Sequence, residues 1–116
     1  MLRRNKYHNV KTYVGDELVD SKKEAKRYRT LLLMQRAGLV RDLQRQVRFI
    51  LQDGYINNQG QKIRPISYNA DFCYFDTERG KKVVEDVKSP ATRTQVYKLK
   101  KKIFEYKYPD YLFLET

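Results

Sequence analysis

The segment VVEDVKS, residues 83–89, combines valines with two adjacent acids and a lysine. Its β-branched valines predict a half-buried strand. Because side chains alternate between the two faces of a strand, Asp86 and Lys88 should share one face and Glu85 the other. On such a face the carboxylate could bind a metal ion, and the neighbouring ammonium group could act on a water molecule.

A second acid is expected to join this pair. The segment YNADFCYFD, residues 68–76, predicts a strand that pairs with residues 81–88 across a turn at 77–80. Asp71 and Asp86 stand at comparable distances from that turn, so they should lie close together. Two neighbouring carboxylates repel each other unless a cation neutralises them. Their hard oxygen atoms suit Mg²⁺ or Mn²⁺.

These residues together predict metal-dependent hydrolysis of phosphodiester bonds. Asp71 and Asp86 would hold the metal, while Lys88 would orient or help to deprotonate the attacking water and offset the growing negative charge. For Lys88, the simpler alternative is an ion pair with Asp86. Glu85 is expected to be an exposed strand acid, although local twist could bring it to the metal.

The elements that must position these side chains are two helices and several strands. A small hairpin over 10–20 is followed by a helix from Ser21 to Gly38, with Ser21 and Glu24 forming a capping box. Further strands are expected at 47–51, 63–76, 81–88 and 111–114, and a second helix at 94–107. This order predicts one α/β or α+β domain over residues 1–116, with a mixed central sheet flanked by helices.

One face of the second helix should pack on the sheet. Its apolar residues recur at helical spacing, which predicts a buried stripe of Val96, Leu99, Ile103 and Tyr106. Four tyrosines could also stack on nucleic-acid bases: Tyr28, Tyr68, Tyr97 and Tyr106.

The charge of the chain indicates a polyanionic partner. With 25 basic and 14 acidic residues the net charge is +11, and nucleic acid is the usual partner of so basic a domain. An anionic membrane surface or an acidic protein remains an alternative. The expected DNA-binding residues lie in a basic N-terminal arm (1–9) and on the two helices: Lys6, His8, Lys22, Lys23, Lys26, Arg27, Arg93, Gln95, Lys98, Lys101 and Lys102.

Other features of the sequence indicate the cellular location of the protein. No run of 18 apolar residues is present and no secretory signal follows the basic start, so no membrane span is expected and a membrane is not among the favoured partners. Cys73 is the single cysteine and cannot form an internal disulfide, which fits a cytoplasmic protein. It is expected to be a small packed residue.

Five sequence blocks, in this order, carry a resemblance to a known family: KYHN, DSKKEA, QRAG, YNADF and VVEDVKS. Asp71 with Asp86-Val87-Lys88 resembles the site of the PD-(D/E)XK nuclease superfamily, which includes restriction endonucleases and archaeal-type Holliday-junction resolvases. The whole chain is similar to a small, mostly phage-encoded family of that superfamily, DUF1064.

The resemblance implies a restriction-endonuclease-like core and a Mg²⁺-dependent endodeoxyribonuclease. It adds Glu24 as a third acid of the site, and Gln95 as a polar residue near the scissile phosphate. It also implies a homodimer acting on branched DNA, such as Holliday junctions, in the host cytoplasm.

Two questions stay open at this point. Glu24 is also the acid of a capping box with Ser21, a role that needs no catalysis. The alternative function is a nucleic-acid-binding protein that keeps the nuclease fold but does not cut. A protein-interaction accessory with a basic face is a third possibility.

Overall fold

The computed structural model describes residues 11–15, 17–19, 21–88 and 93–116. Predictions for the basic N-terminal arm, including Lys6 and His8, lie outside these residues. Neither helix in the described part of the chain has the length and apolarity needed to cross a bilayer.

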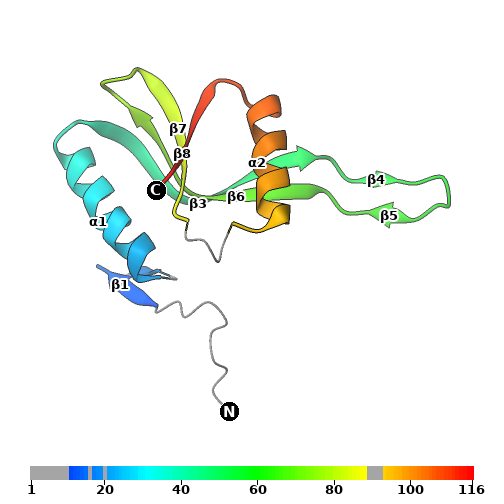
Figure 1. Ribbon diagram of the computed structural model, residues 1–116, viewed down its shortest axis with the longest axis horizontal. Coiled ribbons are helices and arrows are strands. Elements are labelled where there is room, and N and C mark those ends of the chain that lie inside the picture. Colours follow the sequence, from blue (N-terminus) through cyan, green and yellow to red (C-terminus); the bar gives the residue numbers. More distant parts are fainter. Residues whose placement is uncertain (1–10, 16, 20, 89–92) are drawn as a thin grey trace, which may run out of the picture.

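A four-stranded mixed sheet forms the centre of the fold (Figure 1). Its strands, in spatial order, are β3 (Val40–Gln52), β6 (Ile66–Asp76), β7 (Lys81–Asp86) and β8 (Tyr111–Glu115). The neighbours β3, β6 and β7 run antiparallel, whereas β8 pairs with β7 in parallel. This architecture confirms the predicted mixed sheet flanked by helices.

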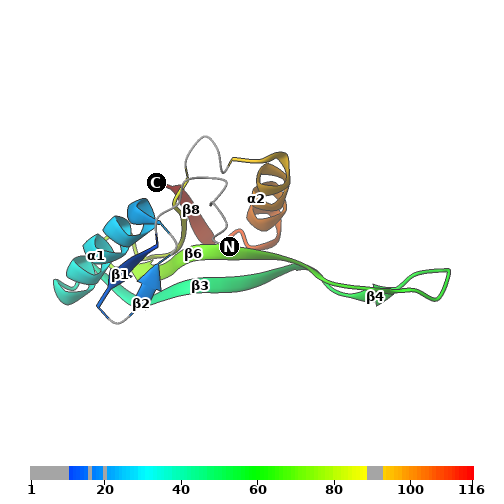
Figure 2. The ribbon, with the colours of Figure 1, turned by 90° about the horizontal axis from the view of Figure 1, so that it is seen from below.

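Helix α1 (Lys22–Arg36) covers one face of the sheet. Its Leu31 is fully buried in a cluster with Val40, Phe72 and Val83. The Ser21 hydroxyl accepts a hydrogen bond from the backbone N–H of Glu24, as predicted for the cap. The small hairpin of β1 (Thr12–Val14) and β2 (Glu17–Val19) packs beside this helix (Figure 2).

Helix α2 (Gln95–Lys107) packs on the other side of β7 and β8 from α1, and Figure 2 shows β8 between the two helices. It begins after Thr94, whose side chain accepts a hydrogen bond from the N–H of Tyr97. Phe104 is fully buried and packs against Phe49 with ring centroids 4.9 Å apart. The two sides of the sheet are thus closed by different helices.

The predicted buried stripe of α2 is wrong at three of its four residues, and only Ile103 packs partly against the core. Val96, Leu99 and Tyr106 are 62%, 59% and 90% exposed. The helix instead turns Tyr97 and Phe104 to the sheet. Tyr97 and Phe104 lie about two turns apart on another side of the helix, so burying them leaves most of the predicted stripe in solvent.

Strand β3 begins seven residues earlier than the predicted 47–51 strand. Its first half, VRDLQRQ, is polar and breaks the alternation that marks a strand. Asp42 and Gln46 have φ values of 56° and 51°, and the register against β6 shifts between Arg41 and Gln44. Because of these interruptions, the first half of β3 lacks the alternating apolar pattern from which a strand is predicted.

A two-stranded ribbon (residues 53–65) extends from the ends of β3 and β6. It contains β4 (Tyr55–Ile56) and β5 (Lys62–Ile63), which pair antiparallel. Both views show it projecting away from the sheet and helices (Figures 1 and 2). The predicted strand at 63–76 is divided here, because β5 ends at Ile63 and β6 begins at Ile66.

Candidate active site

The two acids of the predicted site lie where β6 and β7 stop pairing. Phe72 opposes Glu85 as the last pair of that ladder. Asp71 and Asp86 are the next residues along their strands. The Asp71 carboxylate accepts a hydrogen bond of 2.8 Å from the backbone N–H of Val87, which holds it against the end of β7.

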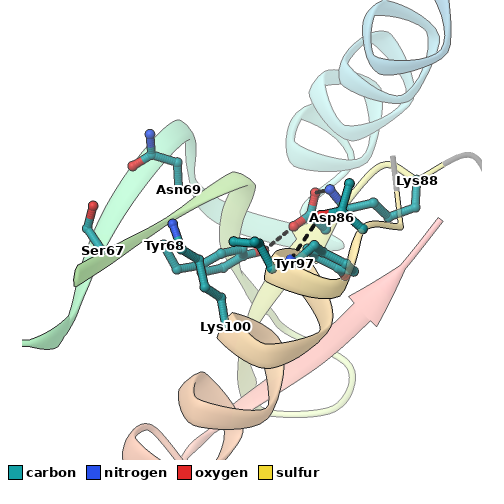
Figure 3. A pocket seen from close by; sticks show the side chains of 9 residues that line it. Ser67, Tyr68, Asn69, Asp86, Lys88, Tyr97 and Lys100 are labelled. Atoms are coloured by element: carbon teal, nitrogen blue, oxygen red, sulfur yellow. Dashed lines mark hydrogen bonds and ion pairs between the residues drawn. The ribbon is translucent and has the colours of Figure 1, made fainter. Parts of the chain in front are cut away.

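Asp86 is almost completely buried, at 2% exposed, and two groups hold its carboxylate. The Tyr68 hydroxyl donates a hydrogen bond to Oδ2, and Lys88 Nζ lies 3.1 Å from Oδ1. The same ammonium group stands 3.9 Å from the centre of the Tyr97 ring, a cation–π contact. Figure 3 shows Asp86 between Tyr68 and Lys88, with Tyr97 alongside.

The surroundings of Asp71 disfavour its charged form. Burial is the main cause, followed by the hydrogen bond and charge of Asp86 and then by the charge of Glu24; together they raise the pKa of Asp71 to about 8. The hydrogen bond from Val87 opposes this shift. Asp71 is therefore a carboxyl group whose negative charge needs a nearby cation.

Glu24 reaches this site from the first turn of α1. It is 6% exposed, so its carboxylate is turned inward. Its backbone N–H binds the Ser21 cap, while its Oε1 accepts a hydrogen bond of 3.0 Å from Gln46. The capping position and the inward carboxylate therefore coexist in one residue.

Gln46 is a site residue that the sequence prediction missed. Its amide Nε2 donates to Glu24 Oε1 at 3.0 Å and to Asp71 Oδ1 at 3.4 Å, and so bridges the two acids. Its φ of 51° is uncommon for a residue other than glycine and costs free energy. No sequence signal singled it out, since it stands in a polar run of β3.

The donor set suits a hard divalent cation. Asp71 and Asp86 offer carboxylate oxygens whose mutual repulsion a cation would relieve. Glu24 is joined to them through Gln46. Among the described residues, no group of three or more His, Cys, Asp or Glu side chains already has the arrangement to hold a metal ion. A metal held by all three acids would thus require the Gln46 amide to move aside.

A cavity of about 340 Å³ opens beside Asp86 and Lys88. Polar side chains from β6, from α2 and from the residue that caps α2 line it next to Tyr68 and Tyr97 (Figure 3): Ser67, Asn69, Lys100 and Thr94. A group bound here would lie next to the Asp86–Lys88 pair, within reach of a cationic side chain.

The expectation that Glu85 is exposed is wrong. Glu85 is 0% exposed because α1 covers its face of β7. Arg27 binds both of its carboxylate oxygens, and the Tyr74 hydroxyl donates a third hydrogen bond of 2.7 Å. Glu85 lies on the face of β7 opposite Asp86, away from the acidic site.

Arg27, one of the predicted DNA-binding residues, is engaged within the fold. Its guanidinium group is committed to Glu85, whose hydrogen bond raises the pKa of Arg27. A side chain held in this way has little freedom to meet a phosphate.

The remaining predicted DNA-binding residues fall into two groups. Those on exposed positions of the helices are Lys22, Lys23, Lys26, Gln95, Lys98 and Lys102. Lys23 Nζ also donates to the backbone oxygen of Lys88, beside the acidic site. Lys101 and Arg93 bind Glu115, at 2.7 and 3.5 Å, so their charge is partly neutralised.

The tyrosines are distributed differently from expectation. Tyr68 and Tyr97, considered as base-stacking residues, are buried, and burial raises the pKa of both hydroxyl groups. Tyr106, assigned to the core, is exposed. Cys73 is buried, as predicted.

The fold and site define a mixed α+β domain with a buried acidic cluster and an adjoining lysine. The chain belongs to the family described as "Protein of unknown function (DUF1064)", whose model matches residues 4–114. No curated protein and no solved structure matches the chain. The resemblance to the DUF1064 family is thereby confirmed, whereas that family description names no activity.

Proposed function

We propose that this protein is a metal-dependent endonuclease of the PD-(D/E)XK type that hydrolyses phosphodiester bonds in DNA. The observation that carries the proposal is the placement of Asp71 beside Asp86, with Lys88 Nζ 3.1 Å from Asp86. Acids brought together in this way destabilise the fold, and such a cost is common at sites with a function.

Each side chain has a defined role in the proposal. Asp71 and Asp86 hold Mg²⁺ or Mn²⁺, with Glu24 as a further ligand. The bound metal would polarise the phosphate and lower the pKa of a water molecule. Tyr68 keeps Asp86 in position through its hydrogen bond. Lys88, held by Asp86 and Tyr97, directs its ammonium group toward the water or the phosphate oxygens.

DNA binding would use the exposed lysines of α1 and α2, which neutralise phosphates without reading sequence. Three finer points rest on the resemblance alone. They are a branched DNA substrate such as a Holliday junction, a homodimer with one site per chain, and work in the cytoplasm, of the host cell if the protein is phage-encoded.

A non-catalytic nucleic-acid-binding protein is the second candidate. One observation favours it: both carboxylate oxygens of Asp86 already have partners within the chain, Tyr68 and Lys88. In that case the acidic cluster would serve packing, and the basic helices would still bind DNA.

Cleavage of three labelled DNAs separates these candidates. A linear duplex, a single strand and a four-way junction are incubated with Mg²⁺, Mn²⁺ or EDTA. The variants are Asp86→Asn and Lys88→Ala, with Asp53→Asn and Lys81→Ala as matched controls at exposed positions. DNA binding is measured in parallel by fluorescence anisotropy.

The nuclease predicts cutting that needs metal and falls by roughly 100-fold or more in Asp86→Asn and Lys88→Ala, with binding retained. The control variants should cut at close to the wild-type rate. Binding without cutting of any DNA under either metal would favour the second candidate.

A further inference from the structure

The ribbon (residues 53–65) is a fixed projection of the fold. At its tip, the Asn57 side chain accepts hydrogen bonds from the backbone N–H groups of Gln59 and Gln61 and donates one to the Gln61 side chain. At its base, Gly54 allows the strands to approach closely, because a Cβ there would lie 3.0 Å from the Ile63 carbonyl oxygen. A projection held in one shape can bind a partner without a large loss of conformational entropy.

The charge of the ribbon selects a polyanion as this partner. The sequence contains no Asp or Glu from Gly54 to Ala70. Lys62 and Arg64 are both exposed in the half of the ribbon that leads into β6. A second copy of this chain, with its net charge of +11, would be repelled. A nucleic acid would be attracted.

The tip of the ribbon carries amide side chains that are free to meet such a partner. Asn58 and Gln59 are exposed, and the hydrogen bonds that shape the tip use the side chains of Asn57 and Gln61 instead. An Asn or Gln amide has both a donor and an acceptor, and so can pair with the edge of an adenine base. The ribbon therefore offers groups for bases as well as cations for phosphates.

The dimensions of the ribbon fit the major groove of a DNA duplex. Two paired strands stand about 4.8 Å apart, and with their side chains they are roughly 10 Å across. The major groove is about 12 Å wide and admits a two-stranded ribbon, whereas the minor groove is only about 6 Å wide. Tyr55 and Ile56, 50% and 71% exposed, could contact the methyl group of thymine, which lies in the major groove.

Polar residues connect the acidic site with the ribbon. Ser67 and Asn69 line the cavity beside Asp86 and Lys88, and Figure 3 shows them on β6 to the left of Asp86. The exposed Arg48 of β3 lies opposite Asn69 in the strand pairing. The ribbon extends from the ends of these same two strands, as Figures 1 and 2 show. A duplex bound at the acidic site could therefore continue along the strands to the tip.

The reach of the ribbon corresponds to about one turn of DNA. The chain runs for about 12 residues from Gln59 at the tip to Asp71. An extended strand rises about 3.3 Å per residue, so the tip stands at most roughly 40 Å from the acidic site. One turn of B-DNA is about 34 Å long.

We propose that the ribbon enters the major groove of duplex DNA about one helical turn from the phosphate bound at the acidic site. Lys62 and Arg64 bind phosphates at the edges of the groove, and Asn58 and Gln59 contact base edges. The inference rests on the DNA binding of the proposed function and not on its cutting. It assigns DNA contacts to a segment outside the two helices and the N-terminal arm.

Equilibrium binding of the full chain to two labelled duplexes tests the ribbon. Fluorescence anisotropy is measured in EDTA, at several salt concentrations, with duplexes of about 10 and about 24 base pairs. The shorter duplex is about 34 Å long, so it cannot contact the acidic site and the tip of the ribbon at once.

Two double variants of equal charge are compared. Lys62→Ala with Arg64→Ala removes the cations of the ribbon. The matched control is Arg79→Ala with Lys81→Ala, which removes the same charge from exposed positions at the opposite end of β6. A third variant, Asn58→Ala with Gln59→Ala, removes the tip amides without a change of charge. All these positions are exposed, so circular dichroism and thermal unfolding should show unchanged folding.

On the longer duplex, we expect the cation variant of the ribbon to raise the dissociation constant about 10-fold relative to the control. Its salt dependence should fall by about two phosphate contacts. On the shorter duplex the two double variants should bind alike. The amide variant should keep the salt dependence of wild type but protect guanine N7, an atom of the major groove, less well against dimethyl sulfate.

Equal affinity and salt dependence of the cation variant and the control on the longer duplex would overturn the proposal. So would a loss of affinity that is equally large on both duplexes, or unchanged N7 protection in the amide variant. A cation variant that sediments differently but binds DNA like the control would also overturn it, because the ribbon would then serve a protein contact.

Because binding is measured without metal, this test is independent of cutting. Ribbon-dependent binding by a protein that cuts no DNA would keep the groove contact and reject the nuclease. Metal-dependent cutting, with a ribbon that proves irrelevant to binding, would do the opposite.

Discussion

Arg27 of α1 donates hydrogen bonds of 2.5 and 2.9 Å to the two carboxylate oxygens of Glu85, which is fully buried in β7. The pair joins the helix to the strand that carries Asp86. Glu85 also accepts hydrogen bonds from the hydroxyl groups of Tyr74 and Thr116. This group of contacts fixes where α1, and with it Glu24, stands relative to the acidic site.

Arg27→Ala should lower the free energy of unfolding by about 3–5 kcal/mol, because it leaves a buried carboxylate without its cation. Lys26→Ala, a neighbouring exposed position on α1, should change it by no more than about 0.5 kcal/mol. Urea unfolding followed by circular dichroism measures both. Equal stability of the two variants would show that the Arg27–Glu85 pair does not hold the helix to the sheet.

Asp71→Asn should stabilise the metal-free protein at pH 8. The pKa of Asp71 is about 8 in the folded chain and near 3.8 in its ordinary state. Between these values the folded state holds a proton that the unfolded state has released, so stability falls as pH rises through this window. The gain in melting temperature for Asp71→Asn should therefore grow from pH 4 to pH 8.

The control for this experiment is Asp53→Asn, an exposed acid at the start of the ribbon. It should change the melting temperature little at any pH. A gain for Asp71→Asn that stayed constant from pH 4 to pH 8 would contradict the raised pKa.

Gln46→Glu should place a third acid between Glu24 and Asp71. The metal-free variant is expected to melt at a lower temperature than wild type, because like charges then meet at hydrogen-bond distance. Mg²⁺ should raise its melting temperature by more than that of wild type, since ligand binding stabilises the folded state. Gln44→Glu, an exposed change on the same strand, is the control and should show neither effect.

The Cys73 thiol should react slowly with Ellman's reagent at pH 8. It is 8% exposed, and burial raises its pKa to about 12, so little thiolate is present and access is poor. Addition of denaturant should make the reaction fast. Rapid labelling of the native protein would mean that the β6 region opens readily between β3 and β7.

Much of the framework follows from local patterns. The Ser21 cap and the Gly38 end bound α1, and Thr94 precedes α2, because these residue types satisfy the unpaired backbone groups of helix ends. The turn at 77–80 sets the pairing that brings Asp71 to Asp86. Short-range signals were sufficient for these features.

The errors share a different cause, which is that the deciding partner is distant in sequence. Glu85 is buried because Arg27, 58 residues away, binds it. Helix α2 has two apolar faces, and periodicity cannot tell which one meets the sheet. Gln46 has a left-handed backbone conformation, with φ of 51°, and nothing in the polar sequence around it predicts this conformation.

The pairing of β8 with β7 has a consequence for synthesis on the ribosome. Thr116 donates its backbone N–H to Asp86 and accepts one from Lys88, both at 2.9 Å, so the segment that carries the acid and the lysine is aligned by the C-terminal strand. A growing chain cannot make these bonds before residue 116 is free of the exit tunnel. The bonds that align Asp86 and Lys88 therefore form only after residue 116 has left the tunnel, and a nascent chain that still holds β8 inside the tunnel lacks them.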